Sequence, residues 1–343
     1  MSLHIGYVKR RKETMNKPNL FSYATSELSQ DAFLCWLIDW ANHEFSEINP
    51  PLHDIGKSFI EAIFQKHGQL CPNIEHISIT RQVDGLDILA VINHKYAILI
   101  EDKTYTRDHT NQLARYRAAV EKRGYHYQLP IYYKIGNQSN YDTVEAAGYK
   151  PFLRKDMLAI LQEGYKRNIT DSIFNDYYQH LLSIEEAYNK YKTAPLNEWK
   201  GLAWQGFYSE LQNAGILGEW DYVSNPQGGF YGFWWHWKNG GDCQLYLQLE
   251  QEKLCVKIEV ADKEKRAYLR TNWCQKVLEK SRDFQLHVKK PSRFGNGRYM
   301  TVAVLENYII TNKDGILDLT STIDVLKRAE KLLDALTAVR TKQ

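Results

Sequence analysis

Two nearly continuous apolar runs, LDILAVI and YAILI, lie close together in the chain and are interrupted by only a few charged residues. The runs cover residues 86–92 and 96–100, and alternate side chains on both faces of each run are apolar. Strands that are apolar on both faces are typical of the middle of a sheet with helices on either side. The charges are Asp87 near the start of the first run and the sequence Glu101-Asp102-Lys103 directly after the second.

The short segment between the runs sets which residues face each other. If residues 93–95 form a three-residue hairpin loop, Ile92 lies opposite Tyr96 and Asp87 lies opposite Glu101. Opposed side chains are about 5 Å apart at Cβ, and like charges there destabilise the pair. Side chains alternate along a strand, so Lys103 shares the face of Glu101 and Asp102 points to the other face.

Two converging carboxylates with a lysine beside them have a specific chemistry. Carboxylate oxygens are suited to Mg²⁺ or Mn²⁺, which keep several waters and are commonly completed by substrate phosphates. Such an ion removes the repulsion between the acids, lowers the pKa of a bound water and polarises a phosphodiester, while a lysine offsets developing charge. Asp87, Glu101 and Lys103 therefore predict metal-dependent phosphodiester hydrolysis.

The composition of the 343-residue chain bounds the remaining choices. It is 43% hydrophobic with a net charge of +3, typical of a globular protein and neutral on whether the partner is a polyanion. No apolar run has the roughly 18 residues of a membrane span, and no secretory signal is visible, which predicts a cytoplasmic protein. The five cysteines are widely spaced without a CxxC pair, which argues against a disulfide framework and a zinc site.

The changing periodicity predicts three regions. Residues 1–20 carry KRRK without apolar periodicity and are expected to be a disordered leader. Residues 21–194 form the first domain and residues 197–343 a smaller α+β domain. In the first domain we expect helices from Thr25 and around 55–64, strands at 76–83, 86–92 and 96–102, a helix at about 108–123, a strand at 129–135, and helices at 156–164 and 171–192.

These residues resemble the PD-(D/E)xK nuclease superfamily in element order and in the Asp87 and Glu101-x-Lys103 motif. The resemblance spans about residues 20–190 and is closest to a bacterial branch. It implies an α/β fold with a restriction-endonuclease-like core, a central mixed sheet flanked by helices, followed by the smaller C-terminal domain. It also implies a Mg²⁺- or Mn²⁺-dependent deoxyribonuclease in defence or DNA processing, with DNA as partner.

The resemblance also assigns roles to the charged residues. Asp87 and Glu101 would hold the metal with the backbone carbonyl of Asp102, and Glu27 would contribute directly or through water. Lys103 would position the attacking water. Glu27 has an alternative role, because an acid in the first turn of a helix is stabilised by the helix dipole alone.

The helix after the motif matches the QxxxY element of RecB-type members through Gln112 and Tyr116, which share one helical face. By resemblance, both would order Lys103 or the phosphate, and the element favours cutting from DNA ends. Tyr116 fits an apolar stripe equally well. Arg107 and Arg115 are candidate phosphate contacts, although a solvated helix face gives the same pattern.

Other functions remain open from sequence. RNA is not excluded as substrate, and a partner protein or a homodimer is compatible with the chain. A catalytically silent nucleic-acid- or protein-binding module would have the same fold, although it would not need Asp87, Glu101 and Lys103 together.

The C-terminal domain contains two motifs with alternative interpretations. The stretch GGFYGFWWHWK (228–238) could stack on bases, but its alternation favours a strand whose aromatic side chains lie in a core. The segment KKPSRFGNGR (289–298) suits phosphate contact, and an ordinary loop explains it equally well.

Overall fold

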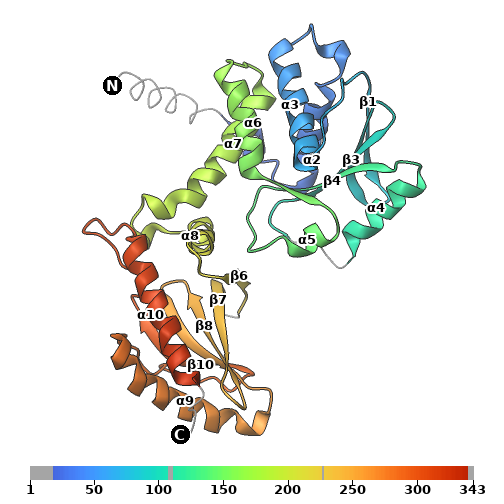
Figure 1. The fold of residues 1–343 in the computed structure, drawn as a ribbon. Helices are drawn as coiled ribbons and strands as arrows, with labels where there is room; N and C mark the ends of the chain where they lie inside the picture. The colour runs from blue at the N-terminus through green and yellow to red at the C-terminus, as the bar shows by residue number, and fades with distance from the viewer. Residues whose placement is uncertain (1–17, 107–110, 226–227, 339–343) are drawn as a thin grey trace. The chain divides into compact units, whose positions relative to one another are not determined.

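The computed structural model describes residues 18–106, 111–225 and 228–338. Within these ranges the chain divides into two compact units, one from residues up to 137 with 141–185, the other from residues 138–140 with those after 185. Figure 1 shows a mixed α/β architecture in the first unit and a second sheet in the C-terminal part. This confirms the fold class predicted from the sequence.

The first unit contains one sheet and the helices that cover it. Its helices are α2 (Glu27–Asp39), α3 (Pro50–Lys66), α4 (Gln112–Lys122), α5 (Asp142–Ala146), α6 (Arg154–Lys166) and α7 (Ser172–Tyr188), the last of which runs into the second unit. Its strands are β1 (Ile77–Val83), β2 (Leu86–Ile92), β3 (Tyr96–Lys103), β4 (Tyr127–Lys134) and β5 (Lys150–Leu153).

The five strands are ordered β1-β2-β3-β4-β5, the first three antiparallel and the last three parallel. In the β2–β3 hairpin Ile92 pairs with Tyr96 and Ile88 with Ile100, which confirms the predicted register. Because β3 and β4 run in the same direction, Lys103 pairs with Lys134 at their common end. The charged end of β3 therefore lies at the carboxyl edge of the parallel part.

Helices cover both faces of the central strands. On one face Leu89, Val91, Ala97 and Leu99 form a buried cluster with Tyr116 and Val120 of α4. On the other face α2 packs against β2 and β3, and α3 packs against β4. Ile88, Ile98 and Ile100 have no exposed surface. The double burial predicted from the apolar runs is thus observed.

Local sequence sets the ends of α3. Pro50 is tolerated at its start because the first N–H groups of a helix lack partners within it, and the Asn49 side chain accepts from the N–H of Leu52 at 3.3 Å. Gly68 follows the helix with φ of +66°, a left-handed conformation that glycine adopts readily.

The described residues of the second unit form an antiparallel sheet with helices on one face. The helices are α8 (Gly201–Asn213), α9 (Arg266–Lys280) and α10 (Leu319–Thr337), and the strands are β6 (Gly218–Val223), β7 (Phe230–Asn239), β8 (Gln244–Glu250), β9 (Lys253–Glu259) and β10 (Tyr299–Glu306). The order is β10-β9-β8-β7-β6. A single core joins helices and sheet, including Phe207, Leu247, Trp273 and Leu332.

The aromatic strand β7 departs from the simple alternation expected for it. Phe233 and Trp235 are buried in the core, as predicted. At His236 the backbone has φ of +59° and the register with β8 shifts, so the alternation is broken. Trp237 is 46% exposed, because the irregularity turns it away from the core. Its ring stacks on that of Tyr246, with 4.0 Å between the ring centres.

Several boundaries differ from those expected from sequence. α5 and β5 were not predicted, and α4 begins at Gln112, after Asn111 in a left-handed conformation. The expected start of α4 near residue 108 and residues 1–17 of the expected leader lie outside the described residues. Leu20–Ser22 already forms a turn of 3-10 helix. None of the helices that the structure describes is both long and apolar enough to cross a membrane.

Candidate active site

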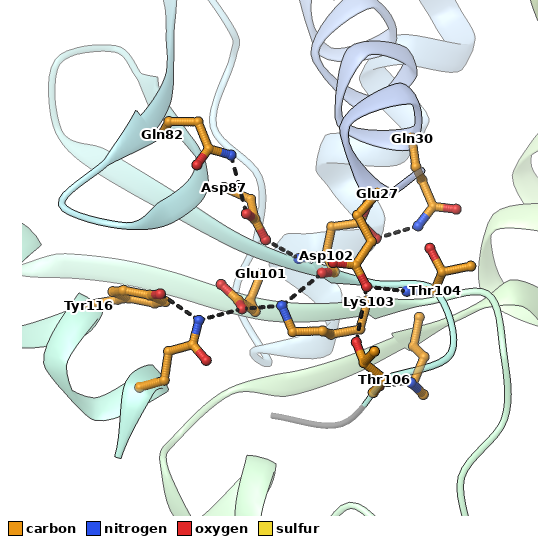
Figure 2. Close-up of polar contacts among 12 residues, drawn as sticks. Glu27, Gln30, Gln82, Asp87, Glu101, Asp102, Lys103, Thr104, Thr106 and Tyr116 are labelled. Carbon is orange, nitrogen blue, oxygen red and sulfur yellow. Dashed lines mark hydrogen bonds and ion pairs between the residues drawn. The ribbon is translucent and has the colours of Figure 1, made fainter. Parts of the chain in front are cut away.

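The carboxylate of Asp87 lies against the backbone at the end of β3. Its Oδ2 accepts a hydrogen bond from the N–H of Asp102 at 2.8 Å, and its Oδ1 accepts from Gln82 Nε2 at 3.3 Å (Figure 2). The first contact crosses from β2 to β3 just beyond the last register pair, Ile88 with Ile100. The hairpin register therefore brings Asp87 beside the Glu101-Asp102-Lys103 sequence.

Glu101 and Lys103 form a buried ion pair on one face of the sheet. Lys103 Nζ lies 2.5 Å from Glu101 Oε1 and donates to the carbonyl of Asp102 at 3.1 Å. Glu101 has no exposed surface, and its Oε2 is buried without a hydrogen-bond partner among the described residues. One carboxylate oxygen is thus held by the lysine and the other is left without a donor.

Burial and neighbouring charge change the proton affinity of this pair. Burial, then the negative charge of Asp87, raises the pKa of Glu101 to about 7, although Lys103 opposes the change. Burial lowers the pKa of Lys103, but the hydrogen bond and charge of Glu101 outweigh it, with help from Asp87 and Glu27, so the net pKa is raised. A cation near Glu101 would favour its charged form.

α4 brings Gln112 and Tyr116 to the same carboxylate. Gln112 Nε2 donates to Glu101 Oε1 at 3.0 Å and to the Tyr116 hydroxyl at 2.5 Å (Figure 2). Gln112 therefore contacts the carboxylate oxygen that Lys103 also binds. The role expected from the sequence, ordering Lys103 or the phosphate, stays a prediction. Tyr116 is buried in the cluster under α4, and burial raises the pKa of its hydroxyl.

Glu27, the first residue of α2, reaches the chain segment that follows β3. Its Oε1 accepts from the N–H of Thr104 and from Thr106 Oγ1, both at 3.0 Å. Figure 2 shows the Glu27 side chain at the same end of β3 as Lys103. Glu27 thus holds this segment in place while adding negative charge to the site.

The Asp102 side chain lies on the opposite face from Glu101, as expected, and has a partner that sequence reasoning missed. Gln30 Nε2 of α2 donates to Asp102 Oδ1, and Gln30 Oε1 accepts from the Tyr177 hydroxyl at 3.4 Å. Asp31, next to Gln30, is 1% exposed, and neither of its carboxylate oxygens has a hydrogen-bond partner among the described residues. Burial, followed by the charge of Asp87, raises the pKa of Asp31 to about 7.

No sequence signal separated Gln30 and Asp31 from ordinary surface positions of α2. Both are polar residues on a helix whose apolar neighbours were used to locate its buried face. The buried partner of Gln30 is Asp102, which lies on β3 about seventy residues later in the chain. The two candidate phosphate contacts remain without a described role, since Arg115 is exposed on α4 and Arg107 lies outside the described residues.

The donor set fits a hard divalent ion. Asp87 and Glu101 supply two carboxylates, and the carbonyl of Asp102 belongs to the residue directly after Glu101. Among the described residues, Glu101 Oε2 is a buried oxygen without a donor. In the ranges that the structure describes, His, Cys, Asp and Glu side chains form no group of three or more arranged to hold a metal ion. Mg²⁺ is commonly held by one or two carboxylates with waters and substrate phosphates, so two suffice.

Comparison with known proteins agrees with this geometry. The model of the PD-(D/E)XK nuclease superfamily matches residues 18–204, more than half of the chain. The chain belongs to this superfamily. The match includes the hairpin with Asp87, Glu101 and Lys103 and both helices that contact it. No curated protein and no solved structure shows significant similarity to the chain.

Membership supports a nuclease and leaves its substrate open. Members of this superfamily are generally nucleases that act with divalent metals, so a nucleic acid is the indicated class of substrate. The residues after 204 lie outside the match, and their function must be argued from their own chemistry.

Proposed function

We propose that the protein is a Mg²⁺- or Mn²⁺-dependent deoxyribonuclease that hydrolyses phosphodiester bonds at the end of β3. The observation that carries the proposal is the buried ion pair of Lys103 with Glu101, at 2.5 Å, beside the Asp87 carboxylate. A structural ion pair needs no second acid close enough to raise the pKa of the first. A metal-ion site beside a positioned ammonium does need such a second acid.

In this proposal Asp87, Glu101 and the Asp102 carbonyl hold the ion, and Glu27 contributes its charge or a water contact. A divalent ion bound there acidifies a water and polarises the scissile phosphate. With a cation bound, Glu101 would hold its charged form at neutral pH, although burial otherwise favours a proton on it.

Lys103 has the clearest chemical role of the chain's own groups. Its raised pKa keeps it charged at neutral pH, so it donates hydrogen bonds and does not act as a base. With a divalent ion held by the carboxylates, the Lys103 ammonium would be available to orient the attacking water or to offset charge on the phosphate. Gln112 keeps the Glu101 carboxylate in place through its 3.0 Å contact.

The test is cleavage of linear, circular and single-stranded DNA, and of RNA, with Mg²⁺, Mn²⁺ or EDTA. We expect metal-dependent cutting of DNA by wild type, reduced about a hundredfold or more in Glu101→Ala and Lys103→Ala. Lys122→Ala, at an exposed position of α4, is the matched control and should cut normally. Cutting of linear but not circular DNA would show dependence on ends.

The contrary outcome is equally specific. If wild type, Glu101→Ala and Lys103→Ala all leave both DNA and RNA intact with both metals, the proposal is wrong and the chain is a binding module with a nuclease fold. If RNA is cut in preference to DNA, the proposed substrate is wrong, but the proposed hydrolysis of phosphodiester bonds stands.

A further inference from the structure

The segment before β10 in the second unit is strongly basic. Between Phe284 and Leu305 the chain has no acidic residue and carries four cations, Lys289, Lys290, Arg293 and Arg298. Two of them are neutralised, because Lys289 pairs with Glu306 at 3.4 Å and Arg298 pairs with Glu259 at 2.6 Å. The other two, Lys290 and Arg293, differ from them in their surroundings.

Lys290 and Arg293 are exposed cations without a carboxylate partner. Among the described residues neither has an acidic side chain within ion-pair distance, whereas their neighbours Lys289 and Arg298 are paired. Lys290 Nζ lies 4.9 Å from the centre of the Phe294 ring. Unpaired cations beside an aromatic ring are complementary to an anion that also presents a flat or apolar group.

A cavity of about 340 Å³ opens between α9 and the basic segment, and Lys290 lines it. Its wall is mostly apolar and includes Cys274, Leu278 and the Phe294 ring, with Lys290 and Glu279 also lining it. Its volume is at the small end of the range for small-molecule sites, about 300–1,000 Å³. A single planar ring system with its sugar is a suitable occupant.

The Phe294 wall is held in place by α9. Arg270 lies with its guanidinium 4.7 Å from the Phe294 ring centre. Its NH1 donates to the Gly295 carbonyl and to Asn296 Oδ1, both at 2.6 Å. These contacts fix the residues that follow Phe294, so the ring is presented by an anchored loop.

We propose that this cavity binds one base of single-stranded DNA against Phe294, while Lys290 and Arg293 contact the adjacent phosphates. An apolar wall with a ring suits base stacking, which is favourable for any base, and the cations suit the backbone. In duplex DNA both faces of a base are covered by its neighbours, so entry of a base costs unstacking that a single strand largely avoids. Gln275 and Glu279 line the cavity with polar groups for the edge of the base.

The inference rests on the proposed function only in naming DNA, and it gives the C-terminal unit the role of gripping substrate. It is tested without cleavage, by fluorescence anisotropy of labelled oligothymidylate of about 15 nucleotides with the full-length protein in EDTA. Failure of binding and failure of catalysis are therefore separate results.

We expect Lys290→Ala/Arg293→Ala to weaken binding about tenfold and to reduce the slope of log affinity against log salt by about 1.4, two single-strand phosphate contacts. Phe294→Ala should weaken binding by about fivefold or more with an unchanged salt slope. Phe294→Leu, which keeps an apolar side chain, should also bind less tightly, which separates loss of stacking from misfolding. Lys313→Ala/Lys331→Ala, at exposed positions of the same unit, is the matched control and should bind like wild type.

An oligonucleotide with abasic sites distinguishes a base from phosphate alone. Wild type should bind it more weakly than oligothymidylate, and Phe294→Ala should bind both alike. Equal affinity of wild type for the two oligonucleotides would overturn the base site, as would wild-type affinity in the Phe294 and Lys290/Arg293 variants. Tighter binding to a duplex of the same length, or no DNA binding at all, would overturn it too, the latter pointing to another anionic partner.

Discussion

At the scale of single residues, Glu101 concentrates the chemistry of the site. One of its oxygens is shared by Lys103 and Gln112, and the other is buried without a donor among the residues that the structure describes. A carboxylate in this position is destabilised by burial and by Asp87, so it strongly favours either a proton or a cation. The metal proposal and the proton affinity are therefore two consequences of the same arrangement.

This arrangement predicts how stability depends on pH in EDTA. The pKa of Glu101 is about 7 in the folded chain and near the ordinary value of 4.5 when unfolded, so the folded state binds the proton more tightly. The stabilisation of the folded state by this bound proton is complete below about pH 4.5 and is lost as the pH rises to about 7. Glu101→Gln should remove this dependence and be more stable than wild type at about pH 8, by on the order of 3 kcal/mol.

Urea unfolding of both proteins across this pH range measures the effect. The two proteins should have similar unfolding free energies at about pH 4 and diverge above it. Parallel curves for wild type and Glu101→Gln would mean that Glu101 binds its proton equally well in the folded and unfolded chain, and the raised pKa of this carboxylate would then be wrong.

At the scale of elements, the β2–β3 hairpin was predictable because its information is local. Its apolar runs fix both strands, and a loop of three residues leaves one register, which places Asp87 beside the end of β3. α5 and β5 are too short to show a period, with Val144 and Phe152 as their fully buried residues. Such elements exist only through tertiary packing, which sequence periodicity does not report.

The contact between α2 and β3 could not be predicted for the same reason. Gln30 is buried against Asp102, and the Asp102 peptide in turn binds Asp87 and Lys103. A polar residue on a helix is expected at the surface unless its partner is known. Similarly, the left-handed conformation of His236, which breaks the alternation in β7, could not be predicted, because the residue at this position is not a glycine.

The α2–β3 contact gives a prediction about stability. Gln30→Leu leaves Asp102 buried without its donor and should lower the free energy of unfolding by about 1–3 kcal/mol. Gln30→Leu/Asp102→Leu replaces both partners by apolar groups and should regain most of that loss. Denaturant unfolding of the three proteins measures it, and a single variant as stable as wild type would show that the contact contributes nothing.

At the scale of the whole molecule, the two units have separate hydrophobic cores. The first unit holds the nuclease motif, and the second unit has its own core around β8, where Leu247 has no exposed surface. Of the nine tryptophans all except Trp36 and Trp40 lie in the second unit, so their fluorescence reports mainly on it.

Separate cores predict separate responses to a core substitution. Leu247→Ala should destabilise the second unit by about 2–5 kcal/mol, seen as an earlier transition of tryptophan fluorescence in denaturant. Mn²⁺ binding by the first unit of the Leu247→Ala variant should persist at denaturant concentrations at which the tryptophan fluorescence of wild type is still native. Loss of Mn²⁺ binding in step with the fluorescence change would show instead that the two units unfold as one.

The measurement that tests the central claim most directly is Mn²⁺ binding by electron paramagnetic resonance without DNA. It compares wild type with Asp87→Asn and with the matched control Asp84→Asn, an exposed acid of the β1–β2 turn that pairs with Arg123 at 2.8 Å. We predict that wild type and Asp84→Asn bind Mn²⁺ equally and that Asp87→Asn loses the site. Equal binding by all three proteins would contradict the assignment of these carboxylates to a metal ion.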